Sequence, residues 1–396
     1  MLAVPISWQK GSILGGAPIR TIEVYKRIAD KGHNVYIIES TPFSSEMMGV
    51  YEPSFNSIRI KIPQANSTFF RVVINPLLWI IKATYVIRKI PKVDIIVSSG
   101  NDFSNIFLAY LASIIHRKPW VVVFHDIFYR SSIKGMLQLL RLRGSSLVDS
   151  LFISIVAKFT LILVKRCSAI LCVSRTVRSL LIKCDVSPEK LWITGNGVNI
   201  YEIQATKPIN EKFDCVFMGR IERAKGVNAL LKAWIKIIKE YQENVSLLII
   251  GDGTYLEHAK KIVVKNNIEK NVRFTGFLVG KEKYRYLKSA RLFVYPSEGF
   301  EGWGLVVAEA LACGLPVIAY EHPVLKEIFS DCQSVIFVQH NIDALVSKIK
   351  ELLADSEALD QLKKKALDCA KKFDWEAISD KELSILEFIV KLHNMG

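Results

Sequence analysis

The nine residues EGWGLVVAE, at positions 301–309, carry the most information in the sequence. They set two carboxylates, Glu301 and Glu309, eight positions apart, with a Gly-Trp-Gly run directly after the first. Upstream, the residues FVYPS at 293–297 predict a short buried strand that proline stops. Downstream, residues 307–313 predict a helix that a glycine and then a proline close. We therefore expect Glu301 in a glycine-bearing loop, and Glu309 one to two turns into the helix that follows.

Such a loop, followed by a helix, favours an anionic ligand. The first backbone N–H groups of a helix have no acceptor within it, and glycines let a phosphate approach closely. An ionised carboxylate above that site only accepts hydrogen bonds, which suits sugar hydroxyls. The stretch predicts a ligand that joins a phosphate to a polyol, as a sugar nucleotide does.

The pattern along the chain alternates short apolar runs with longer helical stretches, which predicts parallel sheets wrapped by helices. A polar, proline-containing stretch at 201–212 predicts a linker between two α/β domains. We expect domains at 1–200 and 213–375, and a last helix at 376–396 that crosses back to the first domain. Predicted strands of the first domain lie at 1–6, 35–38, 93–98, 121–124 and 169–173, and those of the second at 215–218, 246–250, 272–274, 292–295 and 317–319.

Charge is unevenly spread over the 396 residues, whose net charge is +15. Residues 1–200 hold 25 Lys and Arg against 11 Asp and Glu, and the remainder is almost balanced. A domain this basic favours an acidic partner, and without basic–aromatic interleaving a lipid phosphate or anionic membrane ranks above nucleic acid. The most apolar stretch, 147–164, contains Lys158 and is barely long enough to span a bilayer. We expect it to be a helix buried in the first domain, or one that docks on a membrane between flanking basic residues, which are Arg130, Lys134, Arg141, Arg143, Lys165 and Arg166.

The seven cysteines are scattered, with no Cys-x-x-Cys pair. That pattern predicts reduced thiols in a cytoplasmic protein rather than a disulfide or zinc framework. Residues 1–6 are too short for a signal-peptide core and lack a basic flank. The absence of an Asp-x-Asp pair and of a His/Cys cluster predicts chemistry without a metal or cofactor.

Two further segments favour phosphate binding. The stretch GRIERAKG, 219–226, follows a predicted strand and sets Arg220 and Lys225 where they could grip a diphosphate and neutralise its charge as a bond to it breaks. The adjacent Gly15 and Gly16 precede a predicted helix and could turn backbone amides toward a phosphate. They do not form the Gly-x-Gly-x-x-Gly fingerprint, which counts against a dehydrogenase.

The Glu-x7-Glu stretch with its Gly-x-Gly-Leu centre resembles the donor-site motif of the retaining GT-B glycosyltransferases of family 4, with Trp303 in place of the usual Phe. The Gly-Arg-x4-Lys-Gly element and the loop after residues 272–274 resemble further parts of that family, and the likeness spans nearly the whole chain. It implies two Rossmann-like, doubly wound parallel-sheet domains facing a central cleft. The residues matching the family's donor-binding positions are Gly15, Gly16, Arg220, Lys225, Gly276, Phe277, Glu301, Gly302, Trp303, Gly304, Leu305, Val306 and Glu309.

The resemblance implies a metal-independent, retaining transfer of a sugar from a nucleoside-diphosphate donor to an acceptor hydroxyl. Arg220 and Lys225 would hold the leaving diphosphate, and Glu301 would accept from the donor sugar. Glu309 would accept from the ribose. His125, at the end of the strand 121–124, matches a family His near the donor sugar and acceptor. The basic first domain points to a lipid-linked or membrane-adjacent glycan as acceptor, and to a cytoplasmic enzyme peripheral to the membrane.

Two other functions fit the same fold. A nucleotide-sugar epimerase would need acid and base groups in its cleft and no acceptor, and the Glu-x7-Glu motif disfavours it. A non-catalytic sugar-nucleotide binding module would not need the intact set of Arg220, Lys225, Glu301 and Glu309. The base, the sugar, the acceptor and the linkage depend on loop shape and backbone contacts rather than on these motifs.

Overall fold

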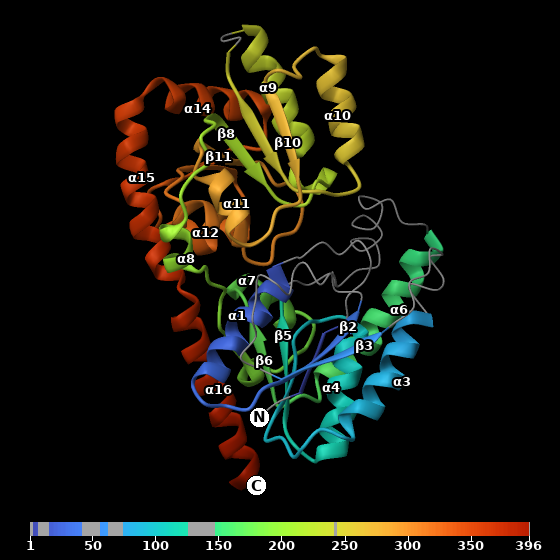
Figure 1. Ribbon diagram of the computed structural model, residues 1–396. Coiled ribbons are helices and arrows are strands. Elements are labelled where there is room, and N and C mark those ends of the chain that lie inside the picture. Colours follow the sequence, from blue (N-terminus) through green and yellow to red (C-terminus); the bar gives the residue numbers. More distant parts are fainter. Residues whose placement is uncertain are drawn as a thin grey trace. The chain divides into compact units, whose positions relative to one another are not determined.

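A computed structural model describes residues 3–6, 16–41, 56–61, 74–125, 147–240 and 244–395. The chain forms two compact units (Figure 1). The first comprises residues 1–196 together with 375–396, and the second is the continuous segment 197–374. The fold class is therefore α/β with two parallel-sheet units, as the sequence predicted.

The second unit contains a parallel sheet whose strand order is β10-β9-β8-β11-β12-β13. Counted from β8, this is the 3-2-1-4-5-6 order of a doubly wound fold, so the direction of winding reverses between β8 and β11. Parallel strands covered on both faces are continuous apolar runs, and the middle strands here are almost wholly buried. The strands are β8 Phe213–Met218, β9 Leu247–Ile250, β10 Val272–Gly276, β11 Ala290–Tyr295, β12 Val317–Tyr320 and β13 Val335–Val338.

The helices of this unit follow from amphipathic spacing. In α9, Leu230, Trp234 and Ile237 recur at helical intervals and are buried, whereas Lys232 and Lys239 are exposed. This helix packs against α10 and α14, and α12 packs against α15. The helices are α8 Ile200–Ala205, α9 Val227–Glu240, α10 Leu256–Lys265, α11 Gly280–Leu287, α12 Leu305–Ala312, α13 Pro323–Phe329, α14 Ile342–Ala354 and α15 Ser356–Ala370.

The first unit repeats the same plan. Its strands form the hydrogen-bonded sets β1-β2-β3 and β4-β5-β6-β7, all parallel, and β1 lies beside β4. The order from edge to edge is therefore 3-2-1-4-5-6-7, again doubly wound. The strands are β1 Ala3–Ile6, β2 Tyr36–Thr41, β3 Asn56–Lys61, β4 Ile96–Ser98, β5 Trp120–Phe124, β6 Ala169–Cys172 and β7 Leu191–Ile193.

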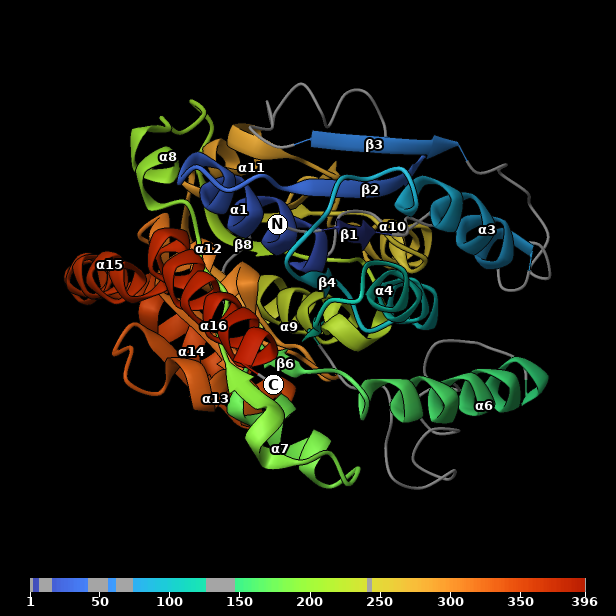
Figure 2. The ribbon, with the colours of Figure 1, turned by 90° about the horizontal axis from the view of Figure 1, so that it is seen from below.

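Three helices of the first unit form a layer in which α4 lies between α3 and α6 (Figure 2). The helix α6 has the bounds of the apolar stretch singled out in the sequence. No helix in the described part of the chain is both long enough and apolar enough to cross a bilayer. The helices of this unit are α1 Gly16–Asp30, α3 Asn75–Ile87, α4 Phe103–His116, α6 Leu147–Val164, α7 Arg175–Ile182 and α16 Trp375–Met395.

A buried charge network attaches α16 to α1. The Arg20 guanidinium donates to the Glu382 carboxylate at 2.5 Å and to the Thr194 hydroxyl at 2.9 Å. The Tyr25 hydroxyl donates to the other Glu382 oxygen at 2.7 Å. Arg20, Glu382 and Tyr25 are all fully buried. The last helix, predicted at 376–396, is thus part of the core of the first unit.

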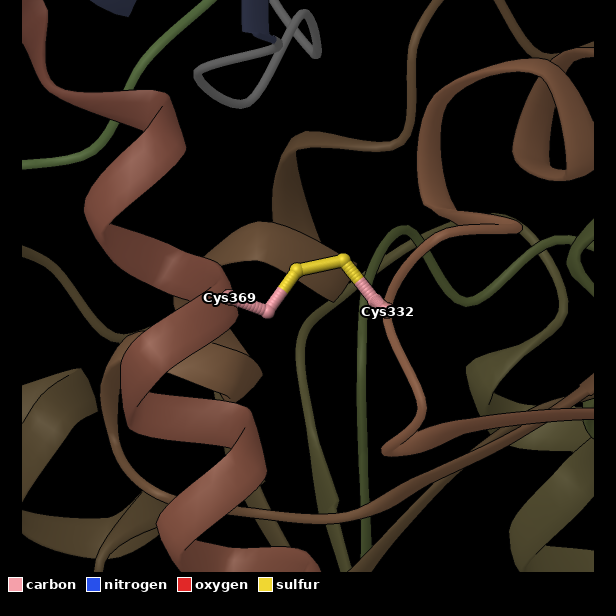
Figure 3. The surroundings of a disulfide bond; sticks show 2 residues. All are labelled: Cys332 and Cys369. Carbon is pink, nitrogen blue, oxygen red and sulfur yellow. A yellow bond between two sulfur atoms is a disulfide. The ribbon is translucent and has the colours of Figure 1, made fainter.

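Three sequence predictions need correction. The stretch 201–212 is not all linker, because its first part belongs to helix α8. The strands β3, β7 and β13 were not predicted. Cys332 and Cys369 were expected to be free thiols, yet the structure joins them in a disulfide between the segment after α13 and helix α15 (Figure 3). The fold brings their Cα atoms to 5.6 Å across 37 residues of sequence, and the other five cysteines are free.

We predict that Glu382→Gln lowers the free energy of unfolding by about 3–5 kcal/mol, because it leaves the buried Arg20 charge unpaired. Urea denaturation measures the loss. The control is Asp380→Asn on the same helix, which breaks an exposed pair with Lys31 and should cost about 1 kcal/mol or less. Equal losses in the two variants would show that the buried pair contributes no more than a surface pair.

Candidate functional site

The candidate site lies where the winding of the second sheet reverses. The carboxyl ends of β8 and β11 are adjacent there, and ligands of doubly wound sheets bind at such a point. The loop after β8 carries Arg220 and Lys225, and the loop after β11 carries Glu301. The strand order therefore brings together two segments that are about 75 residues apart in the sequence.

Glu301 lies at the centre of the contacts between these loops. Its Oε1 accepts from Lys225 Nζ at 2.6 Å, from the Ser297 hydroxyl at 2.6 Å and from the Tyr295 hydroxyl at 2.9 Å. Burial raises the pKa of Glu301, but the charge and hydrogen bond of Lys225, helped by both hydroxyls, outweigh burial and bring the pKa below its usual range. Glu301 is therefore ionised at neutral pH. All of these contacts use Oε1, so among the described residues Oε2 is left to accept from a ligand.

Glycine lets the two loops touch. Gly226 has φ of 79°, and a Cβ atom there would lie 1.7 Å from the Pro296 carbonyl oxygen. The Ala224 carbonyl accepts from the backbone N–H groups of Glu298 and Gly299, at 3.0 and 2.7 Å. Close backbone approach at Gly226 thus holds Lys225 against Glu301.

Glu309 forms a second buried ion pair. Its Oε1 accepts from Lys283 Nζ at 2.5 Å and from the Tyr284 hydroxyl at 3.3 Å. Both charged side chains are at least nine-tenths buried. The sequence analysis did not single out Lys283. Its place one turn before the buried Leu287 on α11 was the available sign that this lysine faces inward.

In the Gly-Trp-Gly run, Gly304 shapes the backbone at the start of α12, and Trp303 packs in the core. Gly304, with φ of 99°, caps α12, and a Cβ atom there would lie 2.5 Å from a Leu325 methyl group. The first N–H groups of the helix, at Leu305 and Val306, have no acceptor within it. The Trp303 side chain is buried and packs edge-on against Phe329 and Phe373. Of the predicted donor-binding residues, Trp303 therefore has a side chain that serves the core.

The two cations of the loop after β8 have different partners. Lys225 pairs with Glu301, whereas the half-exposed Arg220 pairs with Glu222 at 2.7 Å. The Arg220 charge lowers the pKa of the buried Tyr295, although burial and Glu301 together hold that pKa well above its usual range. Arg220 is thus within electrostatic reach of the hydroxyl that binds Glu301. Both side chains of this pair are partly exposed, which leaves Arg220 available to an incoming anion.

His322 is another group near the site that the sequence analysis missed. Its Nδ1 accepts from the Val324 backbone N–H at 3.3 Å, at the start of α13. Burial lowers the pKa of His322, while the nearby Glu301 charge opposes that shift. Further along the sheet edge, the predicted Gly276 ends β10 with φ of 74°, and Phe277 after it is 40% exposed.

The predicted residues of the first unit are placed in part. Gly16 opens α1, and Gly15 lies outside the described residues. His125 follows β5, and its Nε2 lies 2.9 Å from the Ser99 carbonyl oxygen. Burial, assisted by the Arg20 charge, lowers the pKa of His125 to about 3, so the ring is neutral at pH 7. Because a carbonyl oxygen only accepts, Nε2 carries the hydrogen and Nδ1 is an acceptor.

The described residues contain no group of three or more His, Cys, Asp or Glu side chains that could hold a metal ion. The predicted site residues that the structure brings together are Lys225 and Glu301. Arg220 is near them, and Glu309 lies on the helix that continues the same loop.

Two family models match consecutive parts of the chain. The model "Glycosyltransferase Family 4" matches residues 14–202, and "Glycosyl transferases group 1" matches residues 200–368. The chain belongs to the GT-B glycosyltransferases of group 1. The Glu301–Glu309 and Arg220–Lys225 segments lie inside the second match.

Curated relatives of the chain include two alpha-monoglucosyldiacylglycerol synthases. An alpha-monoglucosyldiacylglycerol synthase from Streptococcus pneumoniae is 33% identical over 175 residues, covering 41% of this chain and 39% of the relative. A synthase of the same name from Acholeplasma laidlawii is 25% identical, covering 89% of this chain and 88% of the relative. The alignment spans 39%, 47% and 60% of the length of the pneumococcal enzyme and of two uncharacterised Methanocaldococcus jannaschii glycosyltransferases.

Solved structures share the fold over almost the whole chain. The Anabaena protein HepE in complex with UDP and glucose has a TM-score of 0.76 at 17% identity, covering 98% of this chain and 99% of that one. A sucrose-phosphate synthase from Thermosynechococcus elongatus has a TM-score of 0.78 at 19% identity, covering 99% and 100%. At these identities the likeness establishes the GT-B fold.

We predict that Gly226→Ala costs clearly more free energy of unfolding than Gly32→Ala. Both glycines have positive φ, so each alanine meets backbone strain of about 1–2 kcal/mol. Only Gly226 adds a clash with the Pro296 carbonyl, because nothing lies within 4 Å of a Cβ at Gly32. Urea denaturation of both variants makes the comparison, and equal costs would contradict the close approach of the two loops.

Proposed function

We propose that the protein transfers a sugar from a nucleoside-diphosphate sugar to an acceptor hydroxyl. The observation that carries this proposal is the meeting of Lys225 and Glu301, a cation and an ionised carboxylate, at the switch point of the second sheet. Family membership supports it. Structural neighbours in complex with UDP and glucose, and with UDP-glucose, offer UDP-glucose as the first donor to test.

Each charged group has a role in this proposal. Arg220 and Lys225 hold the diphosphate and neutralise the charge that builds on it as the sugar leaves. The free oxygen of Glu301 accepts from a hydroxyl of the donor sugar, and Glu309 accepts from the ribose hydroxyls while Lys283 holds its other oxygen. The Leu305 and Val306 amides donate to phosphate oxygens. The neutral His125 accepts from a sugar hydroxyl through Nδ1.

We propose a retaining reaction on a single face of the sugar. The bond from the anomeric carbon to the diphosphate oxygen breaks, and the acceptor oxygen bonds to the same face. The acceptor proton passes to the departing phosphate oxygen, so the protein need not supply a nucleophile. This route fits a site whose ionised Glu301 is tied to Lys225 and two hydroxyls.

The acceptor that fits best is a lipid-linked or membrane-adjacent hydroxyl, at the cytoplasmic face of a membrane. One relative is named as a synthase of alpha-monoglucosyldiacylglycerol, and another, from Campylobacter jejuni, as an N-acetylgalactosaminyltransferase that acts on a diphospho-undecaprenol glycan. The strongly basic first half of the chain supports attachment to an anionic surface.

Donor binding tests the site. UDP-, GDP- and ADP-sugars are compared by thermal shift, since a bound donor raises the melting temperature by mass action. We predict that Arg220→Ala and Glu309→Gln each weaken binding of the best donor by about 1.5–3 kcal/mol, the usual loss for a hydrogen bond to a charged group. The control is Arg223→Ala, which removes an exposed cation from the same loop.

Turnover is then followed as nucleoside-diphosphate release, with vesicles that contain diacylglycerol or an undecaprenyl-diphosphate glycan. A product whose anomeric configuration, measured by NMR, matches the donor supports retention, and an inverted product refutes it. Unchanged donor affinity in both variants would overturn the site assignment. Donor conversion that needs no acceptor would instead indicate an epimerase.

We predict that turnover persists in excess EDTA. Arg220, Lys225 and the start of α12 can neutralise the diphosphate without a cation. A chelator titration during the turnover assay provides the measurement. Complete loss of activity in EDTA that Mg²⁺ or Mn²⁺ restores would contradict this prediction.

A further inference from the structure

Two helices of the first unit expose apolar stripes on their outer faces. On α3, Leu77, Ile81 and Tyr85 are between 52% and 61% exposed. On α6, Ile155, Phe159 and Ile162 are between 48% and 59% exposed. The three residues on α3 are four positions apart, and those on α6 are four and then three positions apart. Each trio therefore lies on one side of its helix.

The inner sides of the same helices are also apolar and already buried. Trp79, Ala83 and Ile87 form the buried side of α3, and Ala157 and Val164 lie on that of α6. Both helices pack against α4, whose Ile114 is 55% exposed (Figure 2). A helix that is apolar all round is normally buried all round. Folding of the unit therefore accounts for one side of each helix and leaves the other without a partner in the described structure.

The charges beside these stripes are almost all positive. Residues 75–94 and 155–166 contain seven Lys and Arg and a single acidic residue, Asp94. Lys89 lies over the Tyr85 ring at 4.2 Å from its centroid, so a cation accompanies the stripe itself. The basic residues are Lys82, Arg88, Lys89, Lys92, Lys158, Lys165 and Arg166.

We propose that Leu77, Ile81 and Tyr85 of α3 together with Ile155, Phe159 and Ile162 of α6, the α3–α6 face, insert into the surface of an anionic bilayer. Apolar side chains enter the boundary between headgroups and acyl chains, and the basic residues meet anionic headgroups. A second copy of the chain fits this face poorly, since pairing it with itself would set positive charge against positive charge. The inference deepens the proposed function, on which it rests for a lipid-linked acceptor.

The sequence left two alternatives open for 147–164, a helix buried in the first domain or one that docks on a membrane, and the proposed docking mode adds α3 to the second. The α3 stripe doubles the apolar contact and supplies Tyr85, a residue type enriched at membrane interfaces. Four of the flanking basic residues named from the sequence, Arg130, Lys134, Arg141 and Arg143, lie outside the described residues.

Vesicle sedimentation tests the face. The probes are vesicles of phosphatidylglycerol and phosphatidylcholine in equal parts, and vesicles of phosphatidylcholine alone, each at low and high salt. Wild-type protein should sediment with the anionic vesicles and less so at high salt, where charge attraction is screened. Ile81→Glu and Phe159→Glu should each reduce the bound fraction by about tenfold or more, because each withdraws a large apolar side chain and adds a negative charge. Val264→Glu on α10, at an equally exposed apolar position of the second unit, should bind like wild type.

The outcomes distinguish a failure of the membrane-binding proposal from a failure of the proposed function. Equal vesicle binding by wild type and both variants, or no binding by wild type, would refute the proposal that the α3–α6 face inserts into a bilayer. A wild-type dimer in analytical ultracentrifugation that Ile81→Glu and Phe159→Glu dissociate also overturns it, in favour of self-association. Thermal shift by sugar nucleotides is measured on the same samples. Loss of vesicle binding in the variants with no donor response in any sample would uphold the face and refute the proposed function.

Discussion

The ion pair between Lys225 and Glu301 joins the loops after β8 and β11, and the rest of the candidate site depends on it. Removing two charges from water costs free energy that offsets their attraction, so a buried ion pair does not by itself indicate a contribution to stability. Here Lys225 and the two hydroxyls keep the carboxylate ionised and fix one of its oxygens. The other oxygen is thereby oriented before any ligand arrives, which reduces the ordering that binding must impose.

The sequence singled out Lys225 and Glu301 as site residues but did not predict that they pair with each other. Both residues follow predicted strands, and the resemblance to family 4 assigned both to one nucleotide-sugar donor. Lys225 and Glu301 were nevertheless assigned to different parts of a ligand, a diphosphate and a sugar. Whether two charges at a sheet edge bind each other or a ligand depends on loop geometry, here on the close approach at Gly226. The spacing of motifs carries no such information.

Long-range contacts account for the other omissions. Lys283 pairs with Glu309, 26 residues away in the sequence, and no local sequence pattern predicted this ion pair. The disulfide between Cys332 and Cys369 spans 37 residues and arises because α15 packs beside the segment after α13. Strands β7 and β13 have only three or four residues, too few for period-two alternation to stand out. Trp303 was assigned to the donor from its place in a motif, whereas its side chain fills an aromatic cluster.

Helix α16 determines the order in which the two units can complete their folding during synthesis. The first unit consists of residues 1–196 and 375–396, so its core lacks one helix until α16 has been synthesised. During translation Arg20 leaves the ribosome more than 360 residues before Glu382, and its burial must wait for that partner. The second unit is continuous and can fold while the last helix is still being made. The nascent protein therefore finishes the sheet that carries Lys225 and Glu301 first, and the amino-terminal half becomes native last.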